Sequence, residues 1–180
     1  MFNGRCELIA DHIIAGYPAA CAPPAHHTDA ELHRLVRLLR AARVRTITIG
    51  RGRHCTSIAA AAAINATWAG PDESVEQIVS WPQDAASWLR PARAIAAGEC
   101  DAWVIADTPA GFAQLSRRLA HEERWSPSQT FGFASLASPD LIALTGTLLS
   151  GMTGATSAGG FWLIRRQTLV IDEESDEVRP

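Results

Sequence analysis

Hydrophobic and polar positions alternate along the chain in blocks that predict helices and strands in turn. Four apolar residues between positions 32 and 39 have the spacing of one buried helix face, and Thr28 with Glu31 fits a capping box in front of them. The β-branched run at 44–49 that follows favours a strand. Because further strands alternate with further helices, the pattern indicates a mostly parallel sheet with helices on both faces.

The same patterns place the remaining elements. Helices are predicted at 28–42, 57–68, 83–97, 109–123 and 139–149, and strands at 44–49, 75–81, 101–107, 130–136, 161–166 and 168–172. We therefore expect a three-layer α/β sandwich of the RecA-like or Rossmann-like kind, formed by a single domain over residues 28–172. An irregular segment at 1–27 is expected before it and an acidic tail at 173–180 after it.

Composition limits the class of protein. With 180 residues, of which 47% are hydrophobic and 19% charged, the chain has the make-up of a folded protein. Its four cysteines form no CxxC pair and its first apolar stretch carries charges, so we expect a cytoplasmic protein with reduced thiols. The uncharged run at 141–164 is long enough to cross a membrane, but its glycine, serine and threonine content favours a buried helix, a loop and a strand.

A glycine loop between the predicted strand at 44–49 and the alanine-rich helix is the first candidate site. Its residues are Gly50, Arg51, Gly52, Arg53, His54, Cys55 and Thr56. Strand, glycine loop and helix form the layout that binds phosphate in nucleotide-binding α/β proteins. A P-loop also needs a lysine, and all 16 basic residues here are arginine, so P-loop and lysine Schiff-base chemistry are excluded.

Single residues near this loop have two interpretations each. Cys55 is expected at a helix N-terminus, where the dipole lowers a thiol pKa, and it is either a nucleophile or a small residue of the helix start. Asp107 ends a buried strand, the usual place for a ligand-binding acid, and it is either such an acid or the cap of the next helix.

Two further constellations give weaker signals. A zinc site would draw on His26, His27, Glu31 and His33, and a hydrolase triad on Asp107, Ser116 and His121. The capping box already explains the glutamate, and no G-x-S-x-G elbow accompanies the serine. We therefore predict no catalytic residue, no metal and no cofactor.

Arginines along the first predicted helix suggest a partner. Arg34, Arg37 and Arg40 recur every three residues, and arginine suits bidentate contacts to carboxylate or phosphate. They predict a surface for an acidic protein, with a nucleic acid or nucleotide as an alternative and an ordinary solvated flank as another.

The order of elements also resembles the core of RecA-like proteins. The stretch 84–112, with the segment 93–98 before an apolar strand, is similar to the matching part of the degenerate RecA relatives SulA and ImuA. Asp107 then lies where a Walker B acid would be. This resemblance implies an ATPase-like fold without ATPase activity, which binds a cell-division GTPase or takes part in an SOS polymerase assembly.

These observations predict a non-catalytic, RecA-like regulatory protein that acts by binding another protein. Trp68, Trp81 and Trp125 stand at the ends of predicted elements and suggest a homodimer or a hetero-complex. The alternative is a small α/β enzyme that binds an anionic or phosphorylated substrate at the 50–57 loop.

Overall fold

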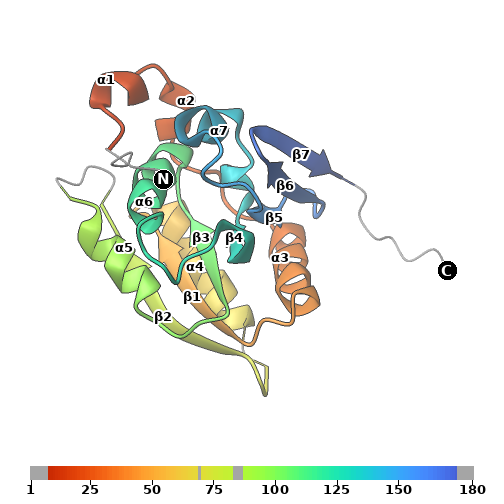
Figure 1. Ribbon diagram of the computed structural model, residues 1–180. Helices are drawn as coiled ribbons and strands as arrows, with labels where there is room; N and C mark the ends of the chain where they lie inside the picture. Colours follow the sequence, from red (N-terminus) through yellow and green to blue (C-terminus); the bar gives the residue numbers. More distant parts are fainter. Residues whose placement is uncertain (1–7, 69, 83–86, 174–180) are drawn as a thin grey trace.

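A computed structural model describes residues 8–68, 70–82 and 87–173 of the chain. In these ranges one sheet has the strand order β2-β1-β3-β4-β5-β6-β7 (Figure 1). Its strands are β1 (Thr46–Arg51), β2 (Ser74–Ser80), β3 (Ala102–Ala106), β4 (Thr130–Gly132), β5 (Thr153–Ala155), β6 (Phe161–Arg165) and β7 (Thr168–Asp172). The pairs from β2 to β5 are parallel, and β6 and β7 add an antiparallel hairpin.

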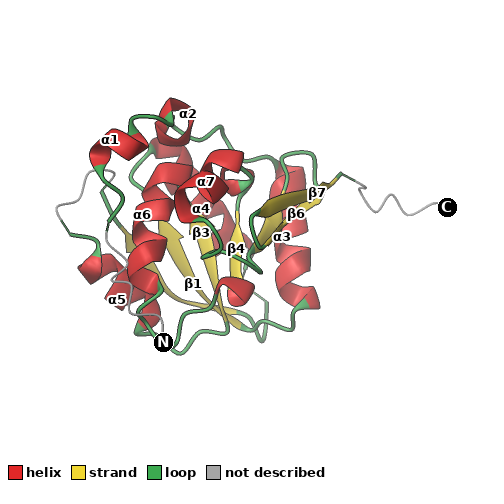
Figure 2. Ribbon diagram, turned by 45° about the horizontal axis from the view of Figure 1, so that its top comes forward, coloured by secondary structure: helices red, strands yellow, loops and turns green. Residues whose placement is uncertain are grey.

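Helices cover both faces of this sheet (Figure 2). They are α1 (Asp11–Ile14), α2 (Pro18–Cys21), α3 (Asp29–Ala41), α4 (Cys55–Thr67), α5 (Leu89–Ala96), α6 (Pro109–Leu119) and α7 (Pro139–Thr145), with 3₁₀ turns η1 (Pro127–Gln129) and η2 (Ala134–Leu136). α3 and α4 pack on one face, and α5, α6 and α7 pack on the other. The predicted three-layer α/β class is confirmed.

The side chains of β3 contribute to two hydrophobic cores, one on each face of the sheet. All five of its residues are buried, as expected of a central parallel strand. Trp103 and Ile105 point into the core under α5 and α6, whereas Ala102, Val104 and Ala106 point into the core under α3 and α4. The small residues on the second side let α4, which is rich in alanine, pack close to the sheet.

The strand order reverses at β1, whose neighbours are β2 and β3. The chain leaves β1 for α4 on one face and leaves β3 for α6 on the other. In open α/β sheets this divergence opens a crevice at the carboxyl ends of the strands, where ligands bind.

β5 differs from the sequence-based prediction, which placed a glycine-rich loop in this region. Its three residues pair with β4 and β6. A Cβ atom on Gly154 would overlap the carbonyl oxygen of Gly132 and the indole of Trp162. Gly132 and Gly154 are therefore needed for close packing against Trp162. β4 is also shorter than predicted, because it ends at Gly132 rather than at residue 136.

The described part of the N-terminal segment contains two short helices, α1 and α2. Ile9 and Ala20 are buried in the core, and the backbone of Ile9 exchanges two hydrogen bonds with the Gln114 side chain, at 2.9 and 2.7 Å. The start of the predicted helix at 83–97 and nearly all of the predicted acidic tail lie outside the described residues.

The three tryptophans expected at an interface belong to the core of this chain. Trp68, Trp81 and Trp125 are 1%, 0% and 7% exposed. Their positions at element ends therefore reflect packing over the two cores, and they give no support to an interface.

Candidate functional site

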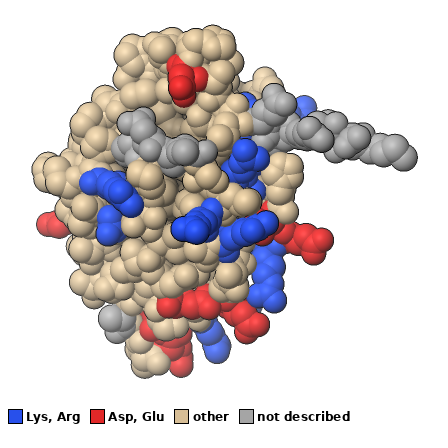
Figure 3. Space-filling view, turned by 90° about the vertical axis from the view of Figure 1, so that its left-hand side faces the viewer, with Lys and Arg blue, Asp and Glu red and all other residues tan. Residues whose placement is uncertain are grey.

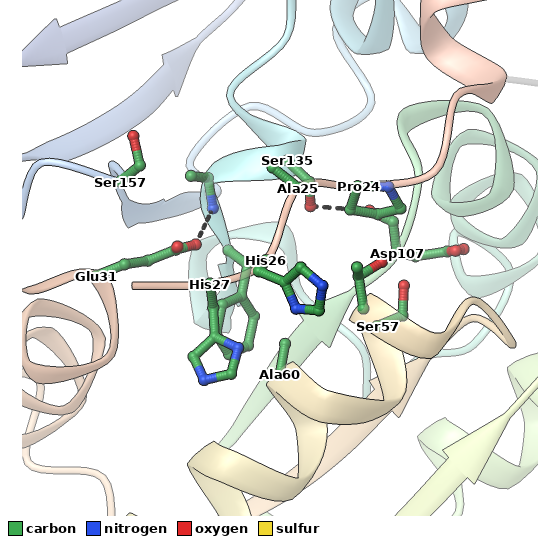
Figure 4. A pocket seen from close by; sticks show the side chains of 13 residues that line it. Pro24, Ala25, His26, His27, Glu31, Ser57, Ala60, Asp107, Ser135 and Ser157 are labelled. Atoms are coloured by element: carbon green, nitrogen blue, oxygen red, sulfur yellow. Dashed lines mark hydrogen bonds between the residues drawn. The ribbon is translucent and has the colours of Figure 1, made fainter. Parts of the chain in front are cut away.

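A pocket of about 250 Å³ lies at the carboxyl edge of the sheet (Figure 4). It is lined by Pro24, Ala25, His26, His27, Glu31, Thr56, Ser57, Ala60, Asp107, Phe133, Ala134, Ser135 and Ser157. These residues follow β1, β3, β4 and β5, or belong to α3 and the segment before it. The pocket therefore occupies the crevice that the strand order predicts.

The first turn of α4 forms one wall. The N-cap residue His54 makes no side-chain capping bond, and the first N–H groups of a helix have no partner within it. Thr56 and Ser57 lie in this turn and are 7% and 1% exposed, yet neither hydroxyl has a hydrogen-bond partner among the described residues. Thr56 was predicted as a ligand residue of the glycine loop, whereas Ser57 was not among the predicted site residues.

Glu31 lies on the opposite side of the pocket, at the first turn of α3 (Figure 4). Its carboxylate accepts hydrogen bonds from the backbone N–H groups of Ala134, at 2.5 Å, and of Thr28, at 3.3 Å. The predicted capping box is confirmed, because the Thr28 hydroxyl in turn accepts from the Glu31 N–H at 3.1 Å. Burial raises the pKa of Glu31, although both backbone N–H groups and His27 act to lower it.

The segment between α2 and α3 borders the pocket with two imidazoles. His26 and His27 lie between Glu31 and Ser57 in Figure 4. The His27 ring meets Phe133 edge-on, with 6.2 Å between ring centroids, and its buried Nδ1 atom has no partner among the described residues. The imidazoles add hydrogen-bonding capacity, and the lining contains no arginine or lysine.

Asp107, the first residue after β3, is fully buried. Its carboxylate accepts a hydrogen bond from Trp81 Nε1 at 2.6 Å, and its backbone carbonyl accepts one from Ser135 Oγ at 2.9 Å. The capping role considered for Asp107 belongs to Thr108, whose hydroxyl accepts from the Gly111 N–H at 3.0 Å. Asp107 thus fixes the loop after β3 against β2 and β4.

The glycine loop contributes less to the pocket than its sequence predicts. Gly50 and Arg51 belong to β1, and a Cβ on Gly50 would overlap Trp81. The Gly52 N–H donates to the Ala106 carbonyl at 3.1 Å, which continues the pairing with β3. Arg53 and Cys55 are exposed and, with His54, are not among the lining residues. Of the predicted ligand residues, only Thr56 and Asp107 line the pocket.

The three predicted partner-binding arginines lie on α3. Arg34 lies over the Phe161 ring at 5.5 Å, and Arg40 forms a bidentate pair with Glu73, at 2.7 and 2.9 Å. Arg37 is exposed on the same helix. Figure 3 shows the other side of the molecule, where α5 lies, and there basic side chains are scattered and some adjoin acidic ones. Binding of an acidic partner by these arginines stays a prediction.

The two other constellations are not assembled. Among the described residues no group of three metal-ligating side chains lies together, although His26, His27 and Glu31 share the pocket wall. Ser116 is buried in α6 and donates to the Ala113 carbonyl at 2.9 Å, and neither it nor His121 lines the pocket.

No helix within 8–68, 70–82 and 87–173 has the length and apolar character needed to cross a bilayer. The uncharged run at 141–164 instead supplies the end of α7, β5 and part of β6.

No family model and no curated protein matches this sequence, so the RecA-like resemblance stays a prediction. The fold is similar to several solved structures. An extracellular ligand-binding receptor from Verminephrobacter eiseniae matches 69% of this chain and 35% of its own, with 16% identity and a TM-score of 0.58. A substrate-binding periplasmic protein from Ralstonia solanacearum matches 77% and 40%, with 16% identity and a TM-score of 0.62.

A branched-chain amino acid ABC transporter periplasmic ligand-binding protein from Burkholderia xenovorans matches 71% of this chain and 34% of its own, with 12% identity and a TM-score of 0.59. The chain thus spans 34–40% of the length of these three structures. The likeness shows a shared α/β fold.

Two sequence-based expectations are corrected by this comparison. These three structures are extracellular or periplasmic ligand-binding proteins, which contradicts both the RecA-like regulatory function and the cytoplasmic location expected from the sequence. Both expectations were wrong for the same reason. An alternating α/β pattern with a glycine loop is common to many doubly wound folds, and its function depends on the site rather than on the fold.

Proposed function

We propose that this chain binds a small organic molecule reversibly in the pocket at the carboxyl edge of the sheet. One observation carries this proposal: residues following four parallel strands meet around about 250 Å³ of space, and two buried hydroxyls in its wall have no partner among the described residues. An unpaired buried polar group costs about 1–3 kcal/mol, which binding of a ligand at this site would recover. The fold shared with ligand-binding proteins supports the same function.

The walls indicate what kind of molecule would fit. Ala25, Ala60 and Phe133 offer apolar contact, whereas serines, a threonine and two histidines offer hydrogen bonds. Pockets of this mixed kind are typical of sites for small molecules. Among the described residues neither the Thr56 nor the Ser57 hydroxyl is hydrogen-bonded to a base, which favours binding over catalysis at these two residues.

Thermal unfolding in the presence of small metabolites tests the proposal. Amino acids, short carboxylates, hydroxy acids and sugars would be screened, because a ligand at one hundred times its Kd stabilises the folded state by about 2.7 kcal/mol. Ala25→Trp should fill the pocket from its exposed border and abolish the shift in Tm. Ala22→Trp, equally exposed but outside the lining, is the matched control. A screen without any shift, or a hit that Ala25→Trp leaves unchanged, would contradict the proposal.

A protein partner for this chain, expected from the sequence as a homodimer or a hetero-complex, remains part of the proposal. The chain spans 34–40% of the length of the three ligand-binding structures reported above. Light scattering over a concentration series, with and without a hit from the screen, measures self-association directly.

A further inference from the structure

The polar groups of the pocket are distributed unevenly, and this distribution bears on the chemistry of the ligand. The first turn of α4 lies on one side and Glu31 on the other, with the two imidazoles between them (Figure 4). One side therefore presents hydrogen-bond donors and the positive end of a helix dipole, and the other presents an acid.

The α4 side has two independent features that favour an anion. α4 has 13 residues and begins without a side-chain cap, so its first N–H groups are available to an acceptor. Separately, the hydroxyls of Thr56 and Ser57 are more than nine-tenths buried in the pocket wall and have no partner among the described residues. A hydroxyl hydrogen can rotate about its C–O bond, so each of the two hydroxyls can donate to a bound oxygen.

The two acids of the pocket already accept hydrogen bonds from the protein. Glu31 lies across the pocket and already accepts from two backbone N–H groups. The carboxylate of Asp107 accepts from Trp81 Nε1, and in Figure 4 it points away from His26. Both carboxyl groups are therefore already engaged in hydrogen bonds with the protein.

From this arrangement we infer that the ligand is a short aliphatic carboxylate whose carboxylate oxygens accept hydrogen bonds from Thr56, Ser57 and the first turn of α4. The inference rests on the proposed function of the same pocket. A carboxylate suits the site better than a phosphate, because the lining has no arginine or lysine to balance a second negative charge. Its aliphatic part lies against Ala25, Ala60 and Phe133.

Titration calorimetry with isovalerate and its neutral amide, isovaleramide, tests the charge requirement on the full chain. The two molecules have nearly the same shape, so a preference of about tenfold or more for isovalerate reports the anion contact. Inorganic phosphate is the third probe and should bind more weakly than isovalerate. Equal binding of the amide, or tighter binding of phosphate, would overturn the inference.

Matched variants test the two hydroxyls. Thr56→Val and Ser57→Ala should each weaken isovalerate binding about tenfold and leave any isovaleramide binding nearly unchanged. Thr145→Val and Ser116→Ala are controls, since these hydroxyls are equally buried but donate to helix carbonyls away from the pocket. Isovalerate affinity that is unaffected at Thr56 and Ser57 would refute the assignment.

The two proposals fail differently. If only neutral compounds from the thermal screen bind, and Ala25→Trp blocks them, the ligand-binding function stands and the carboxylate inference is wrong. If no compound binds, both are wrong.

Discussion

Polar groups are hydrogen-bonded differently at the two ends of the parallel strands: the amino edge, where the strands begin, and the carboxyl edge, where they end. At the amino edge, Asp101 accepts from the N–H groups of Arg45 and Thr46, each at 2.9 Å, and Glu76 accepts from the Glu99 N–H at 3.0 Å. These carboxylates accept hydrogen bonds from backbone N–H groups in or next to the loops before the strands. At this edge the acids therefore satisfy backbone N–H groups of the loops, although the buried Nε1 atom of Trp125, before β4, has no partner among the described residues.

At the carboxyl edge, several buried groups lack such partners. The hydroxyls of Thr56 and Ser57 and the Nδ1 atom of His27 are unpaired among the described residues, and all three side chains line the pocket. Native proteins pair the great majority of buried polar atoms, so a cluster of exceptions in one cavity calls for an explanation. Binding a ligand accounts for the cluster at the expense of stability in the empty protein.

The largest loss of stability is expected at a buried group of the carboxyl edge that does have a hydrogen-bond partner, the carboxyl group of Asp107. Trp81→Phe removes the indole donor from Asp107, which has no exposure to solvent. Loss of one hydrogen-bond partner of a fully buried carboxyl group costs up to about 3 kcal/mol, so the free energy of unfolding should fall by about that amount. Urea denaturation measures it. Trp103→Phe, which loses a bond to the Ile95 carbonyl instead, should cost less, and an equal loss would show that indole packing dominates.

Glu31 should make stability depend on pH. Its folded pKa is raised above the ordinary value of 4.5, mainly by burial. Below pH 4.5 both states are protonated. Between 4.5 and the folded pKa the native state holds more protons than the unfolded state, so the free energy of unfolding falls as pH rises through that window. Each unit of pKa difference contributes about 1.4 kcal/mol.

Glu31→Gln should flatten that dependence in urea titrations carried out at a series of pH values. Glu73→Gln is an informative control, because the hydrogen bond from Arg40 lowers the pKa of Glu73. Its contribution is present above 4.5 and is lost as pH falls through the folded pKa, which is the opposite direction. An unchanged slope in Glu31→Gln would show that the carboxyl does not titrate in the native range.

Elements that depend on local sequence could be predicted, whereas elements that depend on contacts between distant residues could not. β1, α3 and the capping box of Thr28 and Glu31 follow from apolar spacing and local polar residues, and the structure confirms them. β5 has the sequence Thr-Gly-Ala and no hydrophobic pattern, so its place in the sheet depends on packing under Trp162.

The candidate site was predictable only in part for the same reason. Thr56 and Asp107 stand out because each follows a predicted strand. Ser135 and Ser157 enter the pocket only because β4 and β5 lie beside β3, and sequence analysis gave neither of them a role. Gly50 suggested a phosphate loop, whereas its lack of a side chain serves the packing of Trp81.

At the amino edge, Asp101→Ala should cost about 1 kcal/mol of stability, because it removes the acceptor of two backbone N–H groups that remain partly accessible to water. Chemical denaturation measures the loss, and isovalerate affinity should be unchanged. Weaker ligand binding in this variant would mean that the two edges are coupled, and the division proposed here would be wrong.

The smallest effect, and the one of opposite sign, is expected at the pocket hydroxyls. Thr56→Val replaces an unpaired buried hydroxyl with a methyl group of similar size, so the empty protein should be unchanged or more stable by about 0.5–1 kcal/mol. Thr145→Val has the same exposure of 7% but loses a 2.7 Å hydrogen bond to the Leu141 carbonyl, and should be destabilised by about 1 kcal/mol. Thermal and urea unfolding of both variants without ligand provide the comparison. If Thr56→Val is destabilised as much as Thr145→Val, its hydroxyl already has a satisfying contact in the empty protein, and the contrast between the two edges loses its main support.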